Sequence, residues 1–165
     1  MLGLVLATLL ASQAPLEAVP ARDPFLAGLV GCWVIEGRMG EAPLRQRALA
    51  RPVLAGQFIE VCVEQADAPP AGRTPYAAIY LIGYDPEAGR YVMNLFDTFG
   101  VTAAPVPGVG TRTGDQILFR FAYTTGEFLT SLRYDAASRG WTMDQRQRQS
   151  DGSLRTFAVK HWSRC

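Results

Sequence analysis

Histidine and lysine are scarce in this sequence, which contains one of each, His161 and Lys160. A Ser-His-Asp triad would therefore have only one possible general base, and no G-x-S-x-G motif supplies its nucleophile. A histidine-based catalytic metal site is disfavoured by the same count, and neither an H-E-x-x-H motif nor a Walker loop is present. We therefore expect a protein that is not an enzyme and that holds no metal.

Cysteine is also scarce, and its spacing excludes two further classes of site. Cys32, Cys62 and Cys165 are far apart, so no C-x-x-C pair indicates a zinc site or a thioredoxin-type redox centre. Three cysteines can form one disulfide and leave one free thiol.

Neither sign of charge is in excess. The formal net charge is +1, from 16 basic and 15 acidic residues, so a nucleic-acid-binding surface built on surplus lysine and arginine is not expected. The apolar share of 48% is enough to bury a sizeable core, and 165 residues suit a single domain.

A long hydrophobic run is missing except at the N-terminus, where residues 2–11 are apolar or small. This run is shorter than the roughly 20 residues that a membrane span needs, and its length suits a secretory signal. We predict a signal peptide over residues 1–21, with cleavage after Ala21, and a periplasmic or secreted mature chain without an integral membrane span. A cytosolic N-terminal helix is the alternative. The mature domain would then comprise residues 22–165.

The rest of the chain alternates between apolar and polar residues with the period of a β-strand. After one helical turn at residues 24–27, with Asp23 as its N-cap, turns rich in Gly, Pro and Asp separate the extended segments. The segments span 30–38, 43–51, 57–65, 76–84, 91–101, 116–124, 127–134, 141–149 and 154–164, and the Pro/Gly-rich stretch 105–114 is interpreted as a loop. We predict an all-β fold: an antiparallel, up-and-down, lipocalin-like barrel of about ten strands, closed by its first and last strands.

Inward-facing positions of such a barrel supply the candidate ligand-binding residues. Strand parity places His161 inside, together with Phe157 and Val159, and leaves Lys160, Trp162 and Arg164 outside. Core packing, a solvated strand-end aspartate and a hydrogen-bonded histidine are the alternatives to ligand contact. The candidate set is Tyr80, Met93, Asp97, Phe119, Phe121, Tyr123, Phe128 and His161.

Four sequence features together resemble the uncharacterised-domain family numbered 1579. They are Gly31-x-Trp33, the "GQF" at residues 56–58, the "LIGYDPEAGRYV" hairpin and the closing "KHWSR". The resemblance covers about residues 26–164 and implies a lipocalin-like, calycin-type barrel without a settled activity. It also implies structural roles for Gly31, Trp33, Trp162 and Arg164. Leu95 stands where that family commonly has tryptophan, which implies a differently shaped cavity.

A more distant similarity is to the nitrobindin-like haem barrels, which also open with Gly-x-Trp and ligate haem through a late histidine. This likeness implies haem on His161, although the glycine expected soon after Trp33 is missing. Our first hypothesis is an exported barrel without a cofactor that binds a small apolar or amphipathic molecule. A haem protein and a structural envelope protein with a filled core are the alternatives, and the oligomeric state is left open.

Closure of the barrel also predicts which cysteines pair. With an even number of antiparallel strands, the start of the first strand lies opposite the end of the last. We therefore predict a Cys32–Cys165 disulfide, with Cys62 as the free thiol. We further predict that Trp33 is buried at one end of the barrel.

Overall fold

A computed structural model describes residues 20–69, 71–100 and 106–165. Residues 1–19, which form most of the predicted signal peptide, lie outside the described residues. The elements are α1 (Pro24–Ala27), β1 (Gly31–Met39), β2 (Ala42–Val53), β3 (Phe58–Gln65), β4 (Ala77–Asp85), β5 (Arg90–Asp97), β6 (Gly108–Thr113), β7 (Gln116–Tyr123), β8 (Gly126–Asp135), β9 (Gly140–Arg148) and β10 (Leu154–Arg164). In the described part of the chain, no helix is long and apolar enough to cross a membrane.

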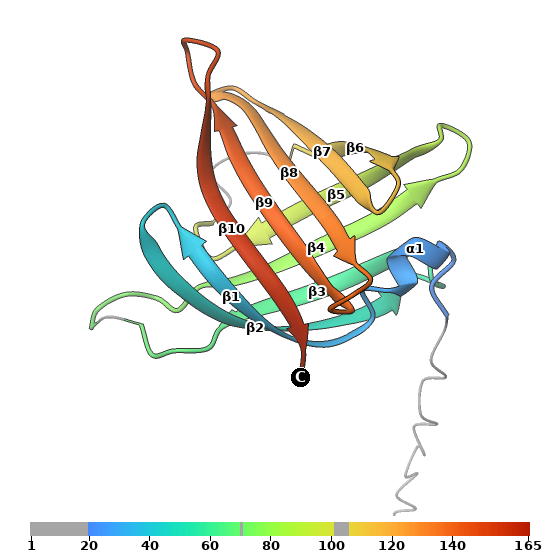
Figure 1. The fold of residues 1–165 in the computed structure, drawn as a ribbon, viewed down its shortest axis with the longest axis horizontal. Coiled ribbons are helices and arrows are strands. Elements are labelled where there is room, and N and C mark those ends of the chain that lie inside the picture. The colour runs from blue at the N-terminus through green and yellow to red at the C-terminus, as the bar shows by residue number, and fades with distance from the viewer. Residues whose placement is uncertain (1–19, 70, 101–105) are drawn as a thin grey trace, which may run out of the picture.

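The ten strands form one closed antiparallel barrel (Figure 1). Each strand pairs with its neighbours in the sequence, and β1 pairs with β10 to close the ring. The predicted fold class and the predicted closure by the first and last strands are therefore confirmed. The register places Trp33 opposite Arg164, which aligns the start of β1 with the end of β10.

Strand β6 corrects the prediction of a loop at residues 105–114. The glycines of this strand face aromatic rings of β7: a Cβ at Gly108 or Gly110 would collide with Phe121 or Phe119, respectively. Glycine has a low intrinsic preference for strands, but here it lets two bulky rings fit inside the barrel. The preceding strand, β5, ends at Asp97, and Val101, the predicted end, lies outside the described residues.

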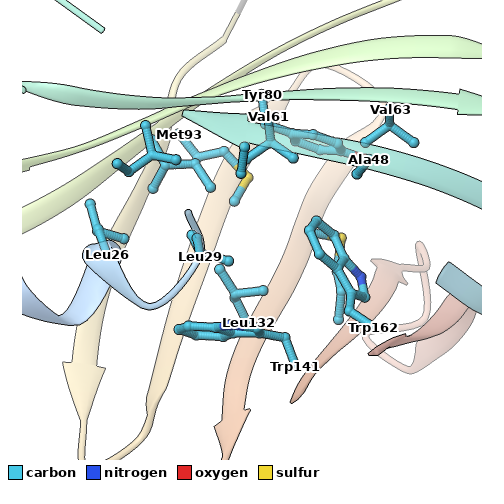
Figure 2. Close-up of a cluster of buried hydrophobic side chains, with 14 of the residues drawn as sticks. Leu26, Leu29, Ala48, Val61, Val63, Tyr80, Met93, Leu132, Trp141 and Trp162 are labelled. Carbon is cyan, nitrogen blue, oxygen red and sulfur yellow. The ribbon is translucent and has the colours of Figure 1, made fainter. Parts of the chain in front are cut away.

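Helix α1 forms as predicted and covers one end of the barrel (Figure 1). Asp23 caps it, because its Oδ1 accepts a hydrogen bond from the Leu26 amide at 2.8 Å. Leu26 and the following Leu29 point into the core between β-strand side chains that include Met93 and Leu132 (Figure 2). We call this the α1 end of the barrel and the opposite one the mouth.

Tryptophans fill the α1 end. Trp33 is 0% exposed, its Nε1 donates to the Leu29 carbonyl at 2.6 Å, and its ring packs edge-on against Trp162 with centroids 6.3 Å apart. The Arg164 guanidinium lies 3.9 Å from the Trp33 ring centroid and donates to the carbonyls of Val30 and Gly28. The start of β1 and the end of β10 are therefore held together over an aromatic core.

The orientation predicted for β10 is wrong. Ala158, Lys160 and Trp162 are buried on the inner face, whereas His161 is exposed on the outer face. A register shift between Thr156 and Ala158 explains the error, because a bulge at Phe157 inserts one residue and reverses the alternation that follows it.

The predicted disulfide is confirmed. Cys32 and Cys165 are bonded, their Cα atoms are 5.5 Å apart, and Cys62 is a free cysteine. The corrected parity of β10 accounts for the bond. Trp33 and Arg164 are paired on the inner side of their strands, so their neighbours Cys32 and Cys165 share the outer face, where both are exposed.

Candidate functional site

Most of the predicted ligand-binding residues do face the interior. Tyr80, Met93, Phe119 and Phe121 are buried there. Nearer the mouth, half-buried Tyr123 and Phe128 join Phe121 in an aromatic group, with ring centroids 5.7 to 6.3 Å apart. The interior is thus lined by aromatic rings from β4, β7 and β8 and by Met93 of β5.

Asp97 lies at the mouth, where β5 ends. It is half-buried, and its Oδ1 accepts a hydrogen bond from the Phe99 amide at 2.9 Å. This bond directs the carboxylate into the turn that follows its own strand. Its negative charge nevertheless contributes to raising the pKa of Tyr76, Tyr80 and Tyr123, so it faces the same interior region.

Lys160 is the functional candidate that sequence reasoning missed. It is 2% exposed and lies midway along β10 on the inner face. Burial lowers its pKa to about 8, an effect that the charge of Asp97 partly opposes. Nζ lies 5.9 Å from the Tyr76 ring centroid, at the outer limit of a cation–π contact. The sequence did contain a signal for it: the one lysine of the chain shares strand parity with two apolar residues, Ala158 and Trp162.

Two tyrosines accompany the lysine. Burial raises the pKa of Tyr76 to about 12 and holds that of Tyr80 well above its ordinary value, with the negative charge of Asp97 adding to both effects. Both phenols therefore keep their protons at neutral pH and can donate hydrogen bonds.

Further polar side chains are buried inside the barrel, namely Gln46, Thr130 and Gln145. Among the described residues, Gln46 Oε1 and Trp162 Nε1 have no hydrogen-bond partner. Buried polar atoms are usually paired, so the interior carries more polar capacity than its own side chains satisfy. We refer to Lys160, Tyr76, Tyr80 and Gln46 as the inner polar cluster.

A pocket of about 360 Å³ opens at the mouth. It lies between the start of β2, the β3–β4 connection and the turn after β5, and it reaches Gln46 and Tyr76 of the inner polar cluster. Leu44 and Phe99 give it apolar walls. Its volume falls within the range of roughly 300–1,000 Å³ that is usual for small-molecule sites.

The arrangement does not fit a haem held by His161. This imidazole lies on the outer face, where its Nδ1 is 3.4 Å from Thr142 Oγ1. It cannot reach the aromatic interior, because its strand directs it to the opposite side of the barrel wall. Within the described ranges, no group of three or more His, Cys, Asp or Glu side chains could hold a metal ion.

Comparison with known proteins bears on the fold. No family model matches the chain, and no curated protein matches it. Among solved structures, the chain is similar to Rv2717c from M. tuberculosis, with a TM-score of 0.58 and 17% sequence identity. The match covers 87% of this chain and 98% of that one. At this identity the likeness is one of fold alone.

Proposed function

We propose that this protein is an exported barrel that binds a small amphipathic molecule in its interior. The observation that carries the proposal is the mouth pocket, which joins apolar walls to the inner polar cluster. Small-molecule sites typically combine a mostly apolar lining with a few polar groups that fix the ligand's orientation. Leu44 and Phe99 would supply the first feature, and Tyr76 and Gln46 the second.

Export and family membership are parts of the same proposal. The Cys32–Cys165 disulfide supports export, because such bonds persist in oxidising compartments. We retain membership of the family numbered 1579 as a proposal, supported by the barrel and by the packing of Arg164 on Trp33. Haem binding through His161 is not proposed, because that side chain points outward.

A structural role with a filled core is the second candidate. It is supported by the α1 end, where Trp33, Trp162 and Trp141 are all buried. This reading predicts that no small molecule enters the mouth.

Binding of Nile red, a neutral apolar dye, separates the two candidates. We expect saturable binding with a stoichiometry of one. Leu44→Trp would fill the pocket and abolish that binding, whereas Leu49→Trp, on the outer face of the same strand and 56% exposed in the parent, would preserve it. Absence of saturable binding to the parent, or equal behaviour of the two variants, would reject an interior site.

A further inference from the structure

We propose that the ligand is a single-chain amphiphile whose acidic head group pairs with the Lys160 ammonium inside the barrel. This inference rests on the proposed function and specifies the chemistry of that same site. The head group would lie deep, at the inner polar cluster, and the apolar chain would extend toward the mouth.

The position of Lys160 supports the depth of the head group. Its register neighbours are Gly37 on β1 and Met143 on β9, both on the inner face, so the lysine stem starts in the middle of the barrel wall. On the α1 side, Trp162 and Trp33 fill the interior. The pocket lies on the mouth side, and Lys160 approaches it through Tyr76, a lining residue whose ring centroid is 5.9 Å from Nζ.

Lys160 lacks a counter-charge among the described residues. Six ion pairs within 4.0 Å are found there, and every one joins an arginine to a carboxylate on the molecular surface. Asp97, the acidic group whose charge partly opposes the effect of burial on the pKa of Lys160, accepts a hydrogen bond from the Phe99 amide. A buried charge without a partner is strongly unfavourable, and a ligand carboxylate or phosphate would neutralise it.

The tyrosines of the interior also favour an anion. Tyr76, Tyr80 and Tyr123 have raised pKa values, so they are neutral donors at neutral pH. Asp97 has the opposite effect, because its negative charge repels an anion. The pocket itself is lined by one further carboxylate, Asp67, and by two cations, Arg45 and Arg73. Lys160 and Asp97 should therefore act in opposite directions on ligand affinity.

The pocket indicates an acyl chain of moderate length. Leu44 and Phe99 provide the apolar contacts, and a volume of about 360 Å³ is near the lower end of the usual range. A fatty acid and a single-chain phospholipid share this chemistry, and they differ in the size of the head group.

The test compares decanoic acid, decanol and decylamine, which share one chain and differ in charge, by calorimetry near neutral pH. We expect decanoic acid to bind most tightly, decanol less tightly and decylamine least tightly. Lys160→Met should weaken the acid about tenfold or more and the alcohol less than about threefold, because an ion-paired hydrogen bond is lost only for the acid. Lys160→Arg should retain acid binding, and Asp97→Asn should strengthen it. Acid affinity should also fall above about pH 8, whereas alcohol affinity should not.

The outcomes separate the two proposals. If all three molecules fail to bind and Nile red also fails, the interior site itself is rejected. If the alcohol binds as tightly as the acid, and Lys160→Met changes neither, the acidic head group is rejected while the proposed function stands. Lysophosphatidic acid replaces decanoic acid in a second arm: stronger binding than decanoate assigns the head group to a phosphate, and weaker binding to a carboxylate. Circular dichroism verifies that each variant is folded.

Discussion

A buried lysine changes the way in which stability depends on pH. Below about pH 8, Lys160 is charged in both the folded and the unfolded chain, so the full cost of burying the ammonium is present. Between about pH 8 and its ordinary pKa of 10.5, only the unfolded chain keeps the proton. The free energy of unfolding therefore rises with pH through this window.

The tyrosines act in the opposite direction. Because burial raises the pKa of Tyr76 and Tyr80 above 10, they lower stability once the unfolded phenols ionise. Burial also raises the pKa of the Cys62 thiol, which lowers stability from about pH 9 upward. These groups are common to the parent and Lys160→Met, so the difference between the two proteins isolates the lysine. Urea unfolding should show parent stability rising from about pH 8 to about pH 10 by roughly 2–3 kcal/mol relative to Lys160→Met. Parallel curves for the two proteins would contradict the assignment of Lys160 as a buried cation.

Trp33 provides a second test at the scale of one residue. Its side chain fills the α1 end and contacts Trp162 and Arg164. Trp33→Ala should lower the free energy of unfolding by about 3–5 kcal/mol, since it leaves a large cavity and removes the hydrogen bond to Leu29. Trp33→Phe, which keeps most of the volume, should cost much less in chemical denaturation. Equal losses for the two variants would show that volume is not what Trp33 contributes.

At the scale of elements, the joint between β1 and β10 closes the barrel. The disulfide links residues separated by 133 positions, so it restricts the unfolded chain strongly. The Cys32→Ser/Cys165→Ser double variant should be less stable than the oxidised parent by about 4–5 kcal/mol in the chain-entropy model.

Cys62 supplies the matched control for that experiment, because it is a free cysteine on β3. Cys62→Ser should unfold at nearly the parent's urea concentration. A double variant as stable as the parent would mean that the disulfide adds nothing to the strand pairing it joins.

Element by element, the limits of sequence reasoning have physical causes. Alternation identified nine of the ten strands, because one face of each strand is apolar. It missed β6, because the inward positions of this strand are glycines. They make room for the neighbouring aromatic rings and give the strand no apolar alternation of its own. It also placed the wrong face of β10 inside, because a single-residue bulge leaves no mark in composition.

The candidate site was predictable in part for the same reasons. The aromatic lining and Met93 followed from parity on β4, β5 and β7, where no bulge intervenes. The inner polar cluster could not be predicted in this way, because the one-residue shift in β10 turns Lys160 to the inner face and His161 to the outer face. The residue expected to bind a ligand proved to be outside, and its neighbour, read as a surface lysine, lies in the core.

On the scale of the whole molecule, the barrel is divided into two halves. The α1 end is filled by buried apolar side chains, which stabilise the fold. The mouth end is partly open and contains Gln46, whose Oε1 has no hydrogen-bond partner among the described residues. In the proposed function, the α1 end supplies stability and the mouth end binds the ligand.

The position of a bound chain tests this account most directly. Isotope-filtered NOE spectroscopy of labelled protein with unlabelled decanoic acid reports which methyl groups touch the ligand. The account predicts contacts to the methyls of Leu44 and Met143, which belong to the mouth and to the wall beside Lys160. Contacts confined to outer-face methyls such as those of Leu49 and Ile79, or no contacts from a saturated sample, would contradict an interior site.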